Sequence, residues 1–318
     1  MTLPGAVPAA PPLAGLRVGV YASGGAPWHH LALAATRGAD VRVVRAEDVA
    51  AGRLARLDAL IFPGGGAIAM AGLLAPLGAE GAATVRRWVA GGGAYVASCA
   101  GSVLPLALDG AADAALPLAR ALRMLDVPLA NRGDATLGGL SSPGVGRVRL
   151  RLDPGHPFAT GLPTEVEAVH YNGPLFDLRS APADVRPFAW PVAATDGFTE
   201  AERFLPAASG AVGATTFERC VAEGAATAIE ARVGQGRIVL FGSHPEFGLG
   251  PLLLGWGDAA RLLVAALAAL PRPARAAGVP ETAWTLRRTA AERDAATLAR
   301  AAAVDLERAA EIRYGQIP

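Results

Sequence analysis

Cys99 has the local sequence of a nucleophile at a sharp turn. It lies in Ala97-Ser98-Cys99-Ala100-Gly101, after an expected strand over 94–97 and before a helix start made of small residues. Such a turn lifts the side chain above the sheet edge, and small residues two positions before and after relieve the crowding. The N–H groups at a helix start favour a thiolate. A lone cysteine in such a turn is also often a buried structural residue, so both interpretations stay open here.

A histidine and a glutamate follow a later strand at a spacing that suits a base and its orienting group. Ser243-His244-Pro245-Glu246 comes directly after an expected strand over 237–241. Two residues apart, the carboxylate can orient the imidazole and stabilise its charged form. The segment alone also fits a helix start, with Ser243 as the cap and Glu246 at the third position.

Glycines end the third expected strand, in Phe62-Pro63-Gly64-Gly65-Gly66. Glycine lets the backbone approach a ligand closely. Gly64 or Gly65, together with the N–H of Ala100, could therefore stabilise the oxyanion of a tetrahedral intermediate. An ordinary strand-to-helix turn is the alternative. It is not a Walker loop, because no Gly-Lys-Ser/Thr follows.

The three segments gain weight from their order and position. Each stands at the C-terminal end of an expected strand, which is where open α/β sheets bind ligands. We therefore expect a nucleophilic site with Cys99, His244 and Glu246. His170 and Asn172 could line the same cleft, although a strand end and turn would explain them equally well.

The remaining histidines and cysteine predict no metal or cofactor site. His29 and His30 are adjacent, so on a helix they point in different directions; a surface or partly buried pair is the favoured interpretation. Cys220 has no neighbouring base and is interpreted as structural. No metal-type spacing of His and Cys occurs, and we expect neither a metal nor a cofactor.

Strand and helix patterns alternate in the first third of the chain, which predicts an α/β fold with a parallel sheet. The stretch over 110–235 is richer in strand patterns. We expect a flexible lead over 1–15, one domain over 16–270 and a helical extension over 271–318. The expected strands are 16–21, 40–44, 57–62, 94–97, 147–152, 166–171, 225–233 and 237–241, and the expected helices are 28–37, 81–90 and 250–270.

Composition excludes several classes of protein. The 318 residues carry a formal net charge of +1, and only 18% are charged. All of the non-histidine basic residues are arginines, and they form no basic block, so no nucleic-acid or membrane partner is expected. The longest apolar run, Leu262–Leu270, is too short to span a bilayer. Two cysteines are not a disulfide framework, and we expect a cytoplasmic protein.

The pattern resembles class I glutamine amidotransferases, whose Cys–His–Glu triad carries its last two members as His-Pro-Glu. It is more closely similar to the N-terminal amidotransferase-like domain of eukaryotic biotin–protein ligases and its free-standing bacterial relatives. The resemblance covers roughly residues 16–270 and rests on 18–21, 59–65, 85–95, 99–101 and 170–174. It implies a flavodoxin-like, doubly wound, mostly parallel sheet with a β-rich insertion, and a triad of Cys99, His244 and Glu246.

The expected reaction is hydrolysis of a small amide, with glutamine as the first candidate substrate. Ammonia would then pass to a synthetase partner, because the chain carries no ATP-binding loop. Where glutaminases usually carry Gln shortly after the nucleophile, this chain has Ser102, Val103 and Leu104. A ligand-binding or regulatory module of weak activity, or a cysteine hydrolase of another amide, are therefore the alternatives. Association into a homo-oligomer stays open.

Overall fold

The computed structural model describes residues 11–65, 69–106, 118–131, 144–195, 214–249, 253 and 255–271. It contains a nine-stranded sheet in the order β2-β1-β3-β4-β9-β8-β7-β5-β6. The strands are β1 (Arg17–Tyr21), β2 (Asp40–Val44), β3 (Ala59–Phe62), β4 (Ala94–Ser98), β5 (Val145–Leu152), β6 (Glu165–Tyr171), β7 (Arg186–Ala194), β8 (Ala228–Val233) and β9 (Gly236–Phe241).

The first half of the sheet is parallel. Strand β1 pairs with β2 and β3, β3 pairs with β4, and β4 pairs with β9, all in parallel. Their order, 2-1-3-4 followed by the last strand, is that of a flavodoxin-like doubly wound sheet. The predicted α/β fold is thus confirmed. Ser98 at the end of β4 pairs with Phe241 at the end of β9, so the residues that follow both strands emerge at one edge.

The second half of the sheet is the predicted β-rich insertion. Pairs β9–β8, β8–β7, β7–β5 and β5–β6 are antiparallel, so only β5 and β8 of the nine described strands run against the others. Strand β7 was absent from our expectations because it contains Pro187 and Pro191, which lack the N–H that a ladder needs. Register shifts at Pro187/Ala189 and at Arg149/Leu150 accommodate these prolines inside the sheet.

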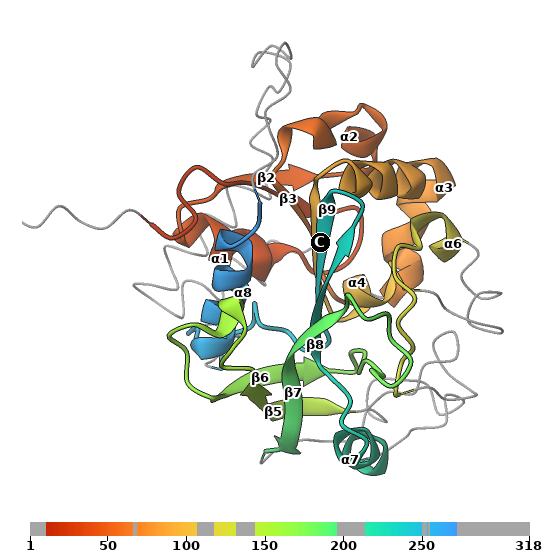
Figure 1. The fold of residues 1–318 in the computed structure, drawn as a ribbon. Coiled ribbons are helices and arrows are strands. Elements are labelled where there is room, and N and C mark those ends of the chain that lie inside the picture. The colour runs from red at the N-terminus through yellow and green to blue at the C-terminus, as the bar shows by residue number, and fades with distance from the viewer. Residues whose placement is uncertain are drawn as a thin grey trace, which may run out of the picture.

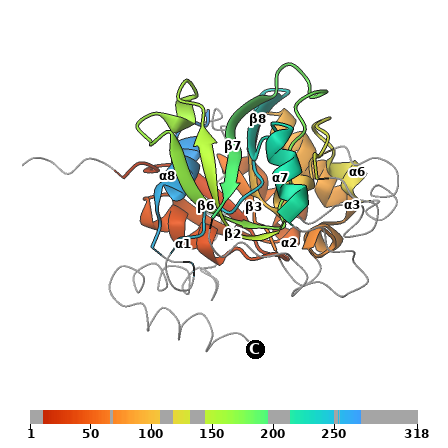
Figure 2. The same cartoon turned by 90° about the horizontal axis from the view of Figure 1, so that it is seen from below.

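Helices lie on both faces of the parallel half (Figure 1). The helices and 3-10 turns are α1 (Trp28–Thr36), α2 (Ala46–Ala50), η1 (Arg53–Arg56), α3 (Ala69–Ala90), α4 (Ala100–Val103), α6 (Ala119–Leu122), η2 (Pro157–Ala159), α7 (Ala214–Ala222) and α8 (Asp258–Ala268). Helices α1 and α8 pack on one face, and α2 and α3 on the other. Figure 2 shows the antiparallel strands at one end of the molecule, with α7 beside them.

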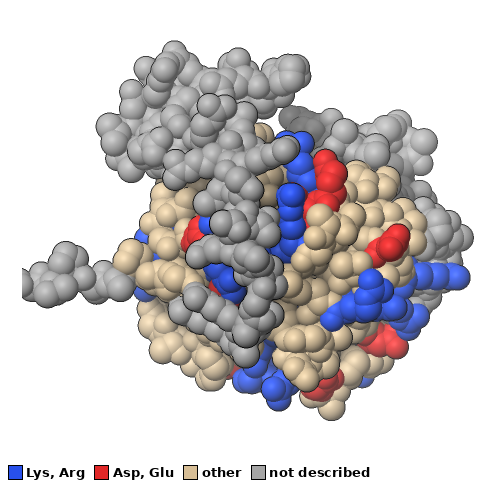
Figure 3. Space-filling model, turned by 90° about the horizontal axis from the view of Figure 1, so that it is seen from above, with Lys and Arg blue, Asp and Glu red and all other residues tan. Residues whose placement is uncertain are grey.

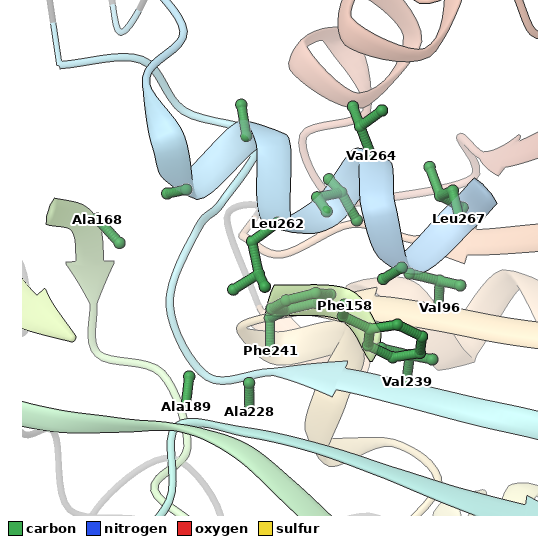
Figure 4. Packing of buried hydrophobic residues seen from close by; sticks show 14 of the residues in the cluster. Val96, Phe158, Ala168, Ala189, Ala228, Val239, Phe241, Leu262, Val264 and Leu267 are labelled. Carbon is green, nitrogen blue, oxygen red and sulfur yellow. The ribbon is translucent and has the colours of Figure 1, made fainter. Parts of the chain in front are cut away.

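The core follows this layering. One apolar cluster joins α1 and α8 to the sheet, and a second joins α2, α3 and α4 to its opposite face. Figure 4 shows Leu262 of α8 directed at the sheet, near Phe241 of β9 and Phe158 of η2. The ring of Phe188 stands edge-on to Phe158 and Phe241, at centroid distances of 5.2 and 5.4 Å. Burying each ring contributes roughly 1.5–3 kcal/mol, so this cluster joins the insertion to the parallel half.

Three boundaries differ from those expected. Helix α3 begins at Ala69, well before the expected Gly81, and it bends at Gly78, whose φ of 64° is non-helical. Helix α8 begins at Asp258 because the chain at Gly257 is extended, so the helix expected over 250–270 is shorter. Leu13, placed in the expected lead over 1–15, is buried and donates its N–H to Arg37 O. Residues 1–10 and 272–318 lie outside the described residues.

Charges on the face drawn in Figure 3 alternate in sign, with arginines next to acidic side chains in several places. Among residues 11–271, as far as the structure describes them, no helix is long and apolar enough to cross a membrane.

Candidate active site

Cys99 occupies a strained turn between β4 and α4. Its backbone has φ 49° and ψ −119°, a conformation that costs a residue with a side chain on the order of 1–3 kcal/mol. Hydrogen bonds hold the turn on both sides: Cys99 N–H donates to Phe241 O at 2.8 Å, and the Tyr95 hydroxyl donates to Gly101 O at 2.7 Å. A Cβ on Gly101 would collide with Phe62 O, which explains the glycine two positions after the cysteine.

His244 and Glu246 form a buried pair beside this turn. Glu246 Oε1 accepts a hydrogen bond from His244 Nδ1 at 2.8 Å, and their side chains are 1% and 4% exposed. The Cys99 sulfur is near enough to His244 to help raise the pKa of the imidazole. The ring of Phe247 stacks on that of His244, with centroids 4.4 Å apart, and Trp256 donates to Glu246 O at 3.0 Å. The pair is therefore fixed by packing as well as by its own hydrogen bond.

The charges of the pair support each other. Burial disfavours a charged imidazole, but the Glu246 carboxylate, the Cys99 sulfur and hydrogen bonds to both raise the pKa of His244 to about 10. Burial likewise opposes the Glu246 carboxylate, yet His30 and His244 hold the pKa of Glu246 well below its usual range. Both groups are thus charged at neutral pH.

Gly64 lies against both the cysteine and the histidine. A Cβ at this position would stand 2.6 Å from Cys99 Cβ and 2.7 Å from His244 Cε1. Real Cβ atoms do not approach other carbons so closely. The glycine at the end of β3 is therefore needed to let the two side chains meet.

Gly64→Ala is expected to slow alkylation of Cys99 by iodoacetamide by roughly a hundredfold, because displacing either reacting group by about 1 Å has an effect of this size. The rate is measured by peptide mass spectrometry. Gly91→Ala is the matched control, since a Cβ there meets no atom closer than 3.4 Å. Equal rates in the two variants would show that the Cys99–His244 approach does not require Gly64.

The two residues whose N–H groups are proposed for the oxyanion, Gly65 and Ala100, directly follow Gly64 and Cys99 in the chain. Ala100 is the first residue of α4, and the first N–H groups of a helix have no acceptor within the helix. Gly65 follows Gly64 with a φ of 70°, and Gly64 O accepts from Ala26 N at 2.9 Å, which fixes the loop. The Gly66 position of the same loop lies outside the described residues.

His170 and Asn172 lie on either side of Tyr171, at the end of β6. The carbonyl oxygen of Tyr171, between them, lies 3.2 Å from Cys99 Sγ. His170 is fully buried beside Ser243 Oγ at 3.2 Å, and burial together with His244 lowers the pKa of His170 to about 3. It is a neutral group behind the site. Asn172 adopts a φ of 51° and donates its N–H to Gly144 O at 2.9 Å, which makes it a turn residue.

Two polar neighbours of Glu246 were missed by sequence reasoning. Ser98 Oγ donates to Glu246 Oε1 at 3.0 Å, and His30 Nε2 lies 3.3 Å from the same oxygen. His29 and His30, expected near the surface, are instead 2% and 1% exposed, because α1 packs them against the loop that follows β9. The sequence signal that could have indicated a place near the site is their position shortly after the glycine turn at Gly24-Gly25. Cys220 is buried on α7, as expected for a structural cysteine, and burial raises its pKa to about 11.

Solved structures with a similar outline include a putative GMP synthase subunit from Thermoplasma acidophilum, at 15% identity and a TM-score of 0.45 over 80% of this chain and 94% of that one. PurLQS from Thermotoga maritima has 15% identity and a TM-score of 0.47, over 79% of this chain and 97% of that one. A glutamine amidotransferase from Thermotoga maritima has 10% identity and a TM-score of 0.39, over 79% of this chain and 81% of that one. No protein-family model matches the chain, and no curated protein matches it.

In the part of the chain that the structure describes, no group of three or more His, Cys, Asp or Glu side chains is arranged to hold a metal ion.

Proposed function

We propose that this protein is a cysteine-dependent amide hydrolase of the glutamine amidotransferase type. The observation that carries the proposal is the buried, charged His244–Glu246 pair that meets, across Gly64, a cysteine held in a strained strand-to-helix turn. An activated nucleophile, a base and a third group that orients the base are the signature of covalent acyl transfer. The closer resemblance to the amidotransferase-like domain of biotin–protein ligases belongs to this proposal.

In the first half of the reaction, the Cys99 sulfur attacks the carbon of a carboxamide. A carbon–sulfur bond forms, and the carbonyl electron pair moves to the oxygen, which the N–H groups of Gly65 and Ala100 stabilise. His244, protonated at neutral pH, gives its proton to the departing nitrogen. The carbon–nitrogen bond breaks, ammonia leaves, and a thioester stays on Cys99.

In the second half, water hydrolyses the thioester. His244, now neutral, takes a proton from the attacking water. The carbon–sulfur bond breaks, and a carboxylic acid leaves. The proton that His244 retains restores the imidazolium, which pairs again with the thiolate. Glu246 stays ionised throughout and keeps Nδ1 of His244 protonated.

The small amide that we propose as substrate is glutamine, and the ammonia would serve a separate synthetase. The sequence supports a partner because it contains no Walker-type loop with which to activate an acceptor itself. Ser102 stands where glutaminases carry side chains for glutamine, and its hydroxyl is already bonded to Phe241 O at 2.8 Å. Recognition of glutamine would therefore depend on other groups.

Ammonia release from L-glutamine, measured together with labelling by a γ-chloroketone analogue of glutamine, tests the proposal. We expect ammonia release and a single label, placed by mass spectrometry on Cys99 and not on the buried Cys220. Labelling of Cys99 without ammonia release would mean that the cysteine is a reactive nucleophile whose substrate is another amide. Saturable binding of glutamine with neither signal would overturn the proposal and favour a binding module.

A further inference from the structure

Glu246 is anchored by more than the histidine it orients. Two hydrogen bonds converge on Oε1, from His244 Nδ1 at 2.8 Å and from Ser98 Oγ at 3.0 Å, and His30 Nε2 lies 3.3 Å from the same oxygen. The other oxygen, Oε2, is buried and has no partner among the described residues. The position of the carboxylate therefore depends on the contacts of one atom, and Ser98 and His30 are two of the three groups beside that atom.

The hydrogen bonds also fix where the protons are. An ionised Glu246 cannot donate, so the single proton of the Ser98 hydroxyl points at Oε1. Ser98 Oγ, 3.0 Å from His30 Nε2, must then accept from that nitrogen. His30 consequently carries a proton on Nε2, while its Nδ1 is buried without a partner among the described residues. The donors run in one direction, from His30 through Ser98 to Glu246.

We propose that His30 and Ser98 are positioning residues, which together clamp Glu246 Oε1 so that the carboxylate stays ionised and directed at His244. The proposal deepens the function proposed above and rests on it. Without the clamp, Glu246 could rotate toward Oε2 or take up a proton. In either case His244 would lose the nearby Glu246 charge that raises the pKa of its imidazole.

The ionisable groups around the pair are fixed by the elements packed on it. They are His30 on α1, Cys99 after β4, and His170 and Tyr171 at the end of β6. His170 is neutral, because its pKa is lowered to about 3, and the pKa of Tyr171 is raised. Neither therefore changes charge in the mildly acidic range.

The test is the pH dependence of Cys99 alkylation by iodoacetamide, which needs no turnover. Each donor to a carboxylate is worth enough to move its pKa by about one unit. In Ser98→Ala and in His30→Phe, the low-pH limb of the alkylation profile should move upward by about one pH unit. At a pH on that limb, the rate should fall about tenfold below wild type.

Conservative and matched variants separate this role from a structural one. Ser98→Thr keeps a hydroxyl and should retain the wild-type profile. Thr36→Ala on the same helix as His30 removes only bonds to Ala32 O and Leu33 O and should also retain it. Folding is checked by the melting temperature of each variant. Should either substitution destroy the fold, the other still reports on the clamp.

The outcomes decide the proposal independently of the substrate. Unmoved profiles in folded Ser98→Ala and His30→Phe, or equal shifts in Ser98→Ala and Ser98→Thr, would overturn the clamp. If wild-type protein releases no ammonia from glutamine but shows the expected profiles, the clamp stands and the glutaminase proposal fails.

Discussion

Cys99→Ala should reduce amide hydrolysis by roughly 10⁴–10⁶-fold, to the level that binding groups alone can sustain. No other described side chain can replace the sulfur, because the second cysteine, Cys220, is fully buried and burial raises its pKa to about 11. The oxyanion donors are backbone groups and survive the substitution, so substrate binding should change little. The measurement is kcat and KM for ammonia release, and the loss should fall on kcat.

Cys220→Ala is the matched control for this variant. It removes the same thiol from a buried position on α7, outside the proposed triad, so its kcat should equal that of wild type. Both variants should keep wild-type circular dichroism. Substantial turnover by Cys99→Ala would assign the chemistry to another group and refute a covalent intermediate on this residue.

Glu246→Gln should lower kcat/KM at neutral pH by roughly 10²–10⁴-fold and also change its pH dependence. The Glu246 carboxylate is the main charge that raises the pKa of His244 to about 10 against the effect of burial. Without it, the pKa of His244 falls. The alkaline limb of kcat/KM, expected near pH 10 in wild type, should therefore move to lower pH. A pH–rate profile checks this, and an unmoved limb in Glu246→Gln would contradict the assigned acid.

The stability of the folded protein should depend on pH through the same two groups, His244 and Glu246. The pKa of His244 is raised in the folded state, so its contribution is complete below about pH 6.5 and is lost as pH rises through about 10. The pKa of Glu246 is depressed, so its contribution is present above about pH 4.5 and is lost as pH falls. The difference in melting temperature between wild type and Glu246→Gln should thus be largest near pH 5–6.5 and shrink above pH 10.

Local patterns in the sequence were sufficient for the parallel half of the sheet and for three of the groups in the site. A glycine two residues after Cys99 and a carboxylate two residues after His244 are short-range signals, and each follows a strand that is mostly apolar. Strand β7 carries prolines, so a rule about local hydrogen bonding argued against it, and the register shifts that admit them depend on the neighbouring strands.

The clamp on Glu246 could not be predicted for a different reason. Its members are far apart in sequence: His30 and Ser98 are separated by 68 residues, and Ser98 and Glu246 by 148. No local period connects a helix after the first strand with a loop after the last. A histidine beside another histidine is also typical of an ordinary helix surface, so the burial of His30 becomes evident only when α1 is packed on the sheet.

The pairing of β4 with β9 also sets the order in which this protein becomes reactive during its synthesis. Ribosomes add about 5–20 residues per second, so the 148 residues from Ser98 to Glu246 take roughly 7–30 s to appear. A nascent chain that ends within the antiparallel insertion can already pair β1 to β4, but its cysteine has no imidazole beside it. The thiol therefore meets cellular electrophiles as an ordinary side chain until β9 is inserted next to β4.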